Sequence, residues 1–293
     1  MHKILQNIRF LWLRAKVKSL GKIHPAGVSK AMFRFFMRPG KATFRSSHQT
    51  LADEAIGLEF VHKKRRIRGY MWGSGEKRVL IVHGWHSHAL YFGTMIESLL
   101  AAGYQVMAFD FGAHGRSDGV YTNLPDFIDQ LIHVLNRTGV PYAVIGHSLG
   151  AVASLFALTE YEGKMPERII SIAPPPRATT FFRQFSDALG GNDAIYQHFI
   201  EHTAKTVGRD IREFQLDRLG PMLPFDRMLH LHDLKDQAVS LEDVQQLLAS
   251  WPEVAHHFTE GYGHNRILQA PEACDHILSF LTQATNQPDH AHQ

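Results

Sequence analysis

Short apolar runs alternate with amphipathic segments from residue 78 to residue 282, and this alternation restricts the fold more than any other feature of the sequence. Segments between the runs have helical spacing; the one at 124–139, for example, has a proline near its start and a glycine at its end. Apolar strands joined by helices form a parallel sheet with both faces covered. We therefore expect an α/β fold with a doubly wound, mostly parallel sheet. The expected strands are RVLIVHG (78–84), YQVMAFD (104–110), PYAVIGHS (141–148), RIISIAPP (168–175), MLHLHD (228–233) and VAHHFT (254–259).

The alternation is interrupted between residues 177 and 226, which are rich in Phe and contain two or three helical segments without a strand. An insertion of this kind between two strands of one sheet is typical of a lid. Ahead of the alternation, LEFVHKKRRIRGYMWG predicts two strands joined through the basic run KKRR. The predicted organisation is a basic helical arm (1–50), an α/β core (51–176 and 227–283), a helical lid (177–226) and a flexible tail (284–293).

The positive charge of the chain is concentrated in the arm. Residues 1–50 contain 11 of the 31 Lys and Arg residues and no Asp or Glu, so the remainder has 31 − 11 = 20 basic and 28 acidic residues. Arg9 and Arg14 interrupt the apolar stretch that a secretory signal needs, and no other segment has the length of apolar sequence that a transmembrane helix requires. A single cysteine excludes an internal disulfide and fits a reducing compartment. We therefore expect a cytoplasmic protein.

The arm has two apolar patches at helical spacing, which leaves two interpretations open. It is either a pair of helices packed on the body, or a peripheral contact with a membrane or an acidic partner. Nothing downstream has the pattern of a base-reading motif, so we expect no nucleic-acid partner, and the sequence does not determine the oligomeric state. One patch would hold Ile4, Ile8, Leu11, Trp12 and Ala15, the other Phe10, Leu13 and Val17, and Phe33, Phe35 and Phe36 would anchor a second helix.

The stretch VIGHSLGAV (144–152) places Ser148 where a buried strand turns directly into a helix. A side chain at such a turn points out over the carboxyl ends of the strands, as in a nucleophile elbow. A serine hydroxyl is a weak nucleophile at neutral pH and needs a base and an orienting carboxylate. Loops after two later strands supply both, because LHLHDLKDQAVS carries Asp233 and Asp236 and EGYGHNRIL carries His264.

These motifs resemble those of the α/β-hydrolase superfamily over about residues 55–283, and in particular bacterial serine hydrolases and esterases with HGW and GHSLG motifs. Two further stretches add to the resemblance. HGW (83–85) stands where the family has its oxyanion loop, and DFGAHGRSDG (110–119) is similar to the family's D-x-x-G-x-G-x-S loop. The family's catalytic aspartate is usually followed by two residues and then Val-Pro. Asp236-Gln-Ala-Val239 fits this frame, with Ser240 in place of the proline.

The resemblance implies a role for each candidate residue. Ser148 would be the nucleophile, His264 the base and Asp236 the acid, while Asp233, the competing carboxylate, would brace the loop. Two backbone N–H groups, those of Trp85 and Leu149, would form the oxyanion hole.

The predicted function is that of a serine hydrolase that cleaves a small-molecule carboxylic ester through an acyl-enzyme, without a cofactor. His83, His86 and His88 form an H-x-x-H-x-H cluster without a nearby Cys or carboxylate, so we expect no metal site. Thioesterase, lipase and peptidase activity with the same triad remain open, because a Phe-rich insertion suits both an acyl pocket and a docked lid. The alternative from another class is a non-catalytic ligand-binding protein of the same fold.

Overall fold

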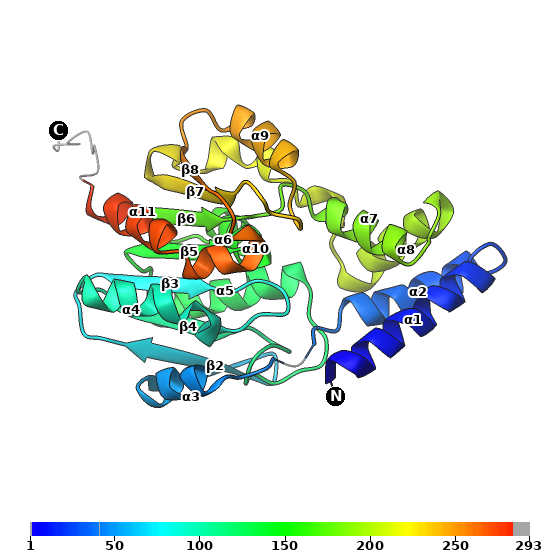
Figure 1. The fold of residues 1–293 in the computed structure, drawn as a ribbon, viewed down its shortest axis with the longest axis horizontal. Helices are drawn as coiled ribbons and strands as arrows, with labels where there is room; N and C mark the ends of the chain where they lie inside the picture. The colour runs from blue at the N-terminus through cyan, green and yellow to red at the C-terminus, as the bar shows by residue number, and fades with distance from the viewer. Residues whose placement is uncertain (1, 41, 284–293) are drawn as a thin grey trace.

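The structure, a computed structural model, describes residues 2–40 and 42–283 and is built around an eight-stranded sheet (Figure 1). The strand order is β1-β2-β4-β3-β5-β6-β7-β8, in which β3 to β8 are parallel and β2 pairs antiparallel with both β1 and β4. The predicted mostly parallel sheet is confirmed. The strands are β1 (Ile56–His62), β2 (Arg65–Trp72), β3 (Arg78–Val82), β4 (Gln105–Asp110), β5 (Ala143–His147), β6 (Arg168–Ile172), β7 (Met228–Asp233) and β8 (Ala255–Thr259).

Helices cover both faces of the sheet and create two hydrophobic cores (Figure 1). The helices α4 (Gly93–Ala101) and α11 (Pro271–Thr282) contribute to one core, and α5 (Leu124–Thr138), α6 (Leu149–Glu160) and α9 (Leu241–Ser250) contribute to the other. Because both faces are packed, the central strands β3, β5, β6 and β7 are buried along almost their whole length. The doubly wound arrangement is therefore confirmed. Shorter helical elements are η1 (Ala89–Phe92), α10 (Gly263–Arg266) and η6 (Ile267–Gln269).

The first hairpin differs from the prediction at its turn. Lys63 and Lys64 form the connection with φ values of 46° and 64°, whereas Arg65 and Arg66 already belong to β2. Arg65 pairs with His62 across the hairpin, and its guanidinium donates a hydrogen bond to Asp126 at 2.5 Å. The prediction that the whole KKRR run is the connection was wrong, because strand pairing and this ion pair hold its second half.

A further helix, α3 (Ser46–Asp53), lies between the arm helices and β1 and was not predicted. Its sequence, SSHQTLAD, has little apolar periodicity, and its buried side chains are His48 and Leu51. Leu51 joins the same core as α4 and α11, so α3 packs on the sheet through this residue.

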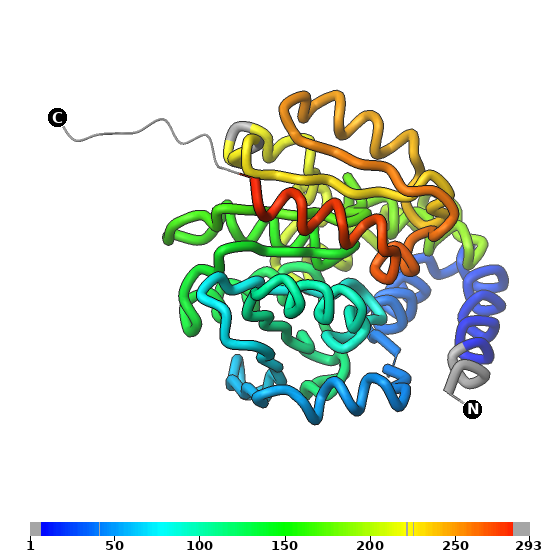
Figure 2. Tube along the Cα trace, turned by 60° about the vertical axis from the view of Figure 1, so that its left-hand side comes forward, coloured from blue at the N-terminus to red at the C-terminus, as the bar shows by residue number. Residues whose placement is uncertain are grey.

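Two long helices of the arm, α1 (His2–Leu20) and α2 (Pro25–Phe36), pack against α7 (Ala178–Ala188) and α8 (Asp193–Val207). Figures 1 and 2 both show them beside this part of the predicted lid. The four helices share a third hydrophobic core, which contains Leu13, Val17, Val28, Met32, Phe182, Ile195, Phe199 and Ile200.

The structure separates the two apolar patches of α1. Leu13 and Val17 are buried in the third core, whereas Ile8, Leu11 and Trp12 are 55%, 59% and 65% exposed. The arm is thus packed on the body through one patch, and contact of the other patch with a membrane periphery stays a prediction. None of the helices in the described ranges combines the length and apolar character that crossing a membrane requires.

Residues 177–226 contain helices and no named strand in the described part of the chain. After α7 and α8 come four short 3-10 turns, and the segment is tied to itself by an isolated β-bridge between Arg177 and Gln215. Its role as a lid stays a prediction, and the predicted flexible tail (284–293) lies outside the described residues. The four turns are η2 (Ile211–Glu213), η3 (Leu216–Arg218), η4 (Gly220–Met222) and η5 (Phe225–Arg227).

Several histidines of the fold are buried and have strongly lowered pKa values. Burial is the largest cause in each case, and it lowers the pKa to about 3 for His83, His88, His114, His147 and His230. In the unfolded chain the same side chains titrate near the ordinary value of about 6.5. Between these pH values the unfolded chain binds protons that the folded protein does not bind.

Acidification should therefore destabilise the fold as the pH falls below about 6.5. While only the unfolded chain is protonated, each of these histidines lowers the free energy of unfolding by about 1.4 kcal/mol for every pH unit of acidification. Urea denaturation followed by tryptophan fluorescence between about pH 7.5 and pH 5 measures the loss. The slope of the unfolding free energy against pH gives the number of protons taken up on unfolding, and replacing His230 by leucine should reduce this number by about one. An unfolding free energy that stays constant over this pH range would contradict the prediction.

Candidate active site

Ser148 lies at the sharp turn between β5 and α6, with φ 53° and ψ −124°. A positive φ is unusual for a residue with a Cβ atom, and it directs the side chain away from the sheet. Two glycines make the turn possible. A Cβ atom on Gly146 would lie 2.5 Å from Ala151 Cα, and one on Gly150 would lie 2.4 Å from the carbonyl oxygens of Val82 and His83. The predicted strand–turn–helix geometry is confirmed.

The structure brings Ser148 together with both partners that the sequence indicated. The hydroxyl of Ser148 lies 2.9 Å from His264 Nε2, and His264 Nδ1 lies 2.7 Å from Asp236 Oδ2. With Nδ1–H donating to the carboxylate, Nε2 is free to accept the hydroxyl proton. The side chain of Asp236 is fully buried, whereas that of His264 keeps 15% of its surface exposed. The imidazole therefore connects a buried carboxylate to the hydroxyl of Ser148.

Asp236 is held in this position by its own loop. Its Oδ1 accepts hydrogen bonds from the amides of Ala238 (2.7 Å) and Val239 (3.0 Å), which leaves Oδ2 for His264. Burial opposes ionisation, but the bond from His264 and the two amides outweigh it, and the pKa of Asp236 lies below its ordinary value. The carboxylate is therefore charged at neutral pH and holds the proton of the imidazole on Nδ1.

Asp233 has a different set of partners. It accepts hydrogen bonds from the amides of Lys235 (2.9 Å) and Tyr262 (3.0 Å) and from the hydroxyl of Thr259 (2.8 Å). These bonds tie the loop after β7 to the end of β8 and to the segment that leads into α10. The contacts are those of a brace, and within the described residues Asp233 forms no hydrogen bond with the His264 side chain.

The amides of Trp85 and Leu149, predicted to form an oxyanion hole, have no acceptor among the described residues. Leu149 is the first residue of α6, whose leading amides have no partner within the helix. Trp85 follows Gly84, on which a Cβ atom would lie 3.0 Å from Ser148 Cβ. The loop after β3 therefore passes directly beside Ser148.

Two buried side chains brace this loop. The His83 Nδ1–H group donates to the carbonyl of Gly84 (2.8 Å), while its Nε2 accepts from the amide of Phe111 (3.0 Å). Asp110 accepts from the amides of Ala89 and Arg116, both at 2.8 Å. The loops after β3 and β4 are thus joined to each other, which agrees with a supporting role for His83.

His147 is a site residue that sequence reasoning missed. Its ring is buried beside Ser148, and its Nε2–H group donates to the carbonyl of His264 at 2.8 Å. Burial, and next the proximity of His264, lower the pKa of His147 to about 3, so the ring is neutral. The residue connects β5 to the loop that carries His264. Its position inside the G-x-S-x-G motif was the only signal in the sequence.

The remaining histidines of the H-x-x-H-x-H cluster have separate contacts. His86 Nδ1 accepts from the amide of Gly40 (2.9 Å), and His88 packs against the rings of Phe44 (4.7 Å between centroids) and His48 (4.8 Å). With His83 bonded to Gly84 and Phe111, the three rings do not converge on a common point.

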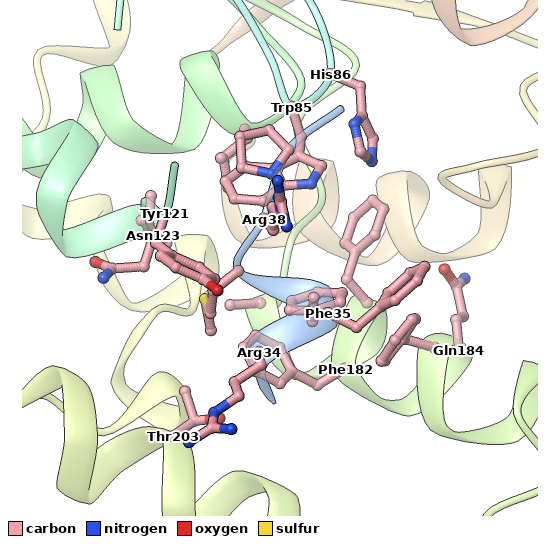
Figure 3. Close-up of a pocket in the computed structure, with 18 of the residues that line it drawn as sticks. Arg34, Phe35, Arg38, Trp85, His86, Tyr121, Asn123, Phe182, Gln184 and Thr203 are labelled. Atoms are coloured by element: carbon pink, nitrogen blue, oxygen red, sulfur yellow. The ribbon is translucent and has the colours of Figure 1, made fainter. Parts of the chain in front are cut away.

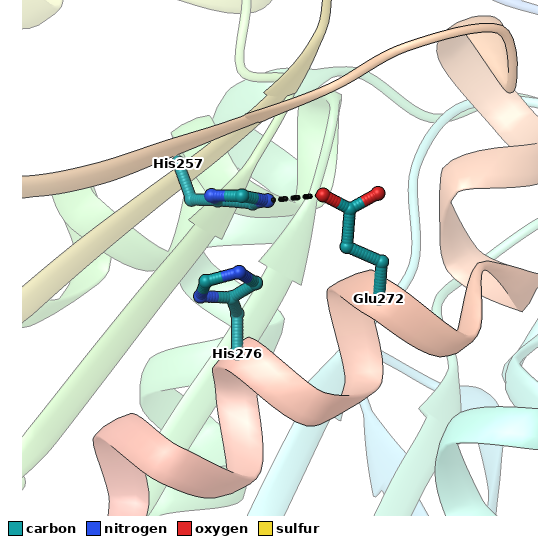
Figure 4. A group of neighbouring side chains, drawn as sticks. All are labelled: His257, Glu272 and His276. Atoms are coloured by element: carbon teal, nitrogen blue, oxygen red, sulfur yellow. Dashed lines mark hydrogen bonds and ion pairs between the residues drawn. The ribbon is translucent and has the colours of Figure 1, made fainter.

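A different group of potential metal ligands lies between β8 and α11 (Figure 4). His257 Nε2 donates to Glu272 at 2.9 Å, and the rings of His257 and His276 stack with their centroids 3.4 Å apart. Lone pairs of stacked rings lie in nearly parallel planes, so they do not point at a common ion. The arrangement is a hydrogen-bonded stack at the edge of the sheet.

A cavity of about 1240 Å³ opens above Ser148 and His264, between the sheet, the arm and the segment 177–226. Most of its wall is apolar and aromatic, and Figure 3 shows Phe35 of α2, Trp85 and Phe182 around it. Phe36 stacks with Trp85, with 6.5 Å between the ring centroids. The arm thus forms one wall of the candidate site, which the sequence did not indicate.

The fold and the site geometry agree with comparisons to known proteins. A family model described as serine aminopeptidase, S33, matches residues 73–262, which is well over half of the chain. The chain belongs to this family of α/β-hydrolases. Within this hydrolase the match begins after β2 and ends two residues before His264, so the arm lies outside it.

Among solved structures, the hydrolase shares its fold with an esterase from Pyrococcus furiosus, with a TM-score of 0.65 and 23% identity over 85% of this chain and 98% of that chain. A serine hydrolase-like protein of Homo sapiens is 30% identical over 111 residues, 36% of this chain and 53% of the relative. The pimeloyl-[acyl-carrier protein] methyl ester esterase of Shewanella woodyi is 26% identical over 143 residues, 48% of this chain and 52% of the relative. The chain thus spans about half the length of these two curated relatives.

Proposed function

We propose that the protein hydrolyses carboxylic esters of small molecules, with Ser148 as the nucleophile, His264 as the base and Asp236 as the orienting acid. One observation carries the proposal: the hydrogen bonds of 2.9 and 2.7 Å form an unbroken chain from Ser148 through His264 to Asp236, below an apolar cavity. A protein that only binds a ligand does not require a base hydrogen-bonded to a serine with a strained backbone. These hydrogen bonds therefore favour an enzyme over a non-catalytic ligand-binding protein.

In the first step, Ser148 Oγ forms a bond to the ester carbonyl carbon while its proton passes to His264 Nε2. The amides of Trp85 and Leu149 would donate to the carbonyl oxygen as it becomes negative, and a donor of this kind lowers the barrier by about 3 kcal/mol. The bond to the alcohol oxygen then breaks as His264 returns the proton to that oxygen. An acyl-serine and a free alcohol result.

In the second step, water attacks the acyl carbon and gives a proton to His264 Nε2. The bond to Ser148 Oγ breaks, and the serine oxygen takes that proton back from His264. The carboxylic acid leaves and the site returns to its starting state, with Asp236 charged throughout because its pKa lies below the ordinary value. We propose that residues 177–226 and the arm together cover the reacting groups and limit the access of water.

Fluorophosphonate labelling of the folded protein tests the proposal. We expect one label, located on Ser148 by peptide mass spectrometry, and hydrolysis of acyl esters that decreases with the fraction labelled. Parallel assays with thioesters and with peptides of matched acyl groups separate the esterase from a thioesterase or peptidase. A folded protein that neither accepts the label nor turns over any of these substrates would be a ligand-binding protein.

Replacing His147 by alanine should slow the reaction without preventing it. The substitution removes the hydrogen bond to the carbonyl of His264, so the imidazole is less well aligned with Ser148. We expect kcat to fall by about 10- to 100-fold with little change in KM. His147→Gln retains an N–H donor and should recover part of the loss. Equal rates for the wild type and the alanine variant would refute this positioning role.

A further inference from the structure

Among the described residues, the charged side chains that border the cavity are all basic and all come from the arm. Arg9, Lys16, Lys30, Arg34 and Arg38 line it, and none of the described lining residues is Asp or Glu. In the described part of the chain, none of these five forms an ion pair with a carboxylate. Arginines elsewhere on the surface do have such partners.

The basic and apolar groups occupy different depths of the cavity. Arg34 and Arg38 are exposed, whereas Phe182, Ile211 and Phe214 are buried. Figure 3 shows Arg34 and Arg38 on opposite sides of Phe35 in this view. The cavity therefore has an apolar interior and a positively charged rim.

A neighbouring side chain responds to this charge. The pKa of His202 on α8 is lowered, first by burial and then by the positive charges of Lys30, Arg34 and Lys205. Unpaired cations beside low-dielectric walls focus a positive potential at the mouth of a cleft. Guanidinium groups in addition bind phosphate and carboxylate through paired N–H donors.

We propose that the substrate is an anionic amphiphile: an acyl chain that enters the apolar interior, joined through its ester or thioester to a part that carries phosphate or carboxylate at the basic rim. The proposal rests on the proposed acyl-enzyme function, because it assigns the cleaved bond to the position of Ser148. The cavity exceeds the range of about 300–1,000 Å³ usual for small-molecule sites, so it has room for both parts. Because the family match begins at residue 73, the rim is a feature of this chain's arm.

Matched pairs of substrates test the proposal with the full-length protein. One pair is dodecanoylglycerol and dodecanoylglycerol phosphate; the other is the dodecanoyl thioester of N-acetylcysteamine and that of coenzyme A. Each pair has one acyl chain. The glycerol pair differs only by a phosphate, whereas the coenzyme A leaving part is both more anionic and larger than N-acetylcysteamine, so the charge contribution in that pair is read from the arginine variant. The test variant is Arg34→Gln with Arg38→Gln. The matched control is Arg14→Gln with Lys18→Gln, which removes the same charge from exposed arm positions outside the cavity.

We expect the wild type to favour the anionic member of at least one pair by about tenfold or more in kcat/KM, a ratio that decreases with added salt. The ratio should fall about tenfold in the Arg34/Arg38 variant, mainly through KM, and should persist in the control. A preference in the glycerol pair identifies a lipid headgroup, and one in the thioester pair identifies a coenzyme. Equal rates within both pairs, or an equal loss of preference in both variants, would overturn the proposal.

Binding of substrate-like amphiphiles separates failure of this proposal from failure of the proposed function. Isothermal titration with dodecyl phosphate and with the neutral dodecyl maltoside requires no turnover. If no ester or thioester is cleaved, the hydrolase function fails. Tighter binding of dodecyl phosphate that is lost in the Arg34/Arg38 variant would still support the anionic site, and equal binding of the two amphiphiles would overturn it.

Discussion

Replacing Ser148 by alanine should lower kcat for ester hydrolysis by about 10⁴-fold or more and abolish labelling by fluorophosphonate. Without Oγ there is no hydroxyl proton for His264 to accept and no nucleophile, so neither His264 nor Asp236 can assist the formation of an acyl-enzyme. The fold should be retained, because alanine keeps the Cβ atom and the backbone at φ 53° carries the same strain. The measurement is kcat together with the thermal unfolding midpoint of the same preparation.

Ser154→Ala is the matched control for this substitution. Ser154 lies on α6, the helix that follows Ser148, is 2% exposed against 8% for Ser148, and donates a hydrogen bond to the carbonyl of Gly150 at 2.7 Å. Its replacement should cost stability of about 1 kcal/mol and leave kcat within a few-fold of the wild type. If Ser148→Ala retained more than about a tenth of the activity, the acyl-serine mechanism would be wrong.

The sheet could be predicted because its central strands are buried on both faces. Such strands appear as continuous apolar runs, and β5 and β7 lie within the ranges expected from the sequence. The meeting of Ser148, His264 and Asp236 follows from the same topology, since the loops after β5, β7 and β8 all leave from one edge of the sheet. The apolar runs, together with the rule that loops after parallel strands meet at one edge of the sheet, were sufficient to predict that these three residues lie together.

The rest of the cavity depends on contacts between distant segments. Two patches of α1 have similar apolar character, and only the surface formed by α7 and α8 determines that Leu13 and Val17 are buried. The bond from His147 to the carbonyl of His264 joins residues 117 positions apart. The basic rim likewise follows from how the arm docks, and no spacing within the arm indicates that Arg34 and Arg38 lie over the candidate site.

The second large effect is expected for Asp236→Asn, which should lower kcat by about 10³- to 10⁴-fold with little change in KM. An amide at this position is neutral, so it no longer stabilises the imidazolium form of His264. It can also present an N–H group toward Nδ1, which favours the wrong tautomer. The carboxylate is already ionised at neutral pH because its pKa lies below the ordinary value. Asparagine cannot ionise, so raising the pH should not restore the missing charge or the wild-type activity.

Asp233→Asn is the control that decides which aspartate is the acid. Asp233 is buried too, but its bonds go to Lys235, Thr259 and Tyr262. The amide variant should lower the unfolding midpoint, because a buried acceptor becomes a poorer one, while kcat stays within about tenfold of the wild type. Parallel measurement of kcat and thermal unfolding separates the two roles. Loss of turnover in Asp233→Asn with normal turnover in Asp236→Asn would transfer the acid role to Asp233, and the 2.7 Å bond between His264 and Asp236 would then have only a structural function.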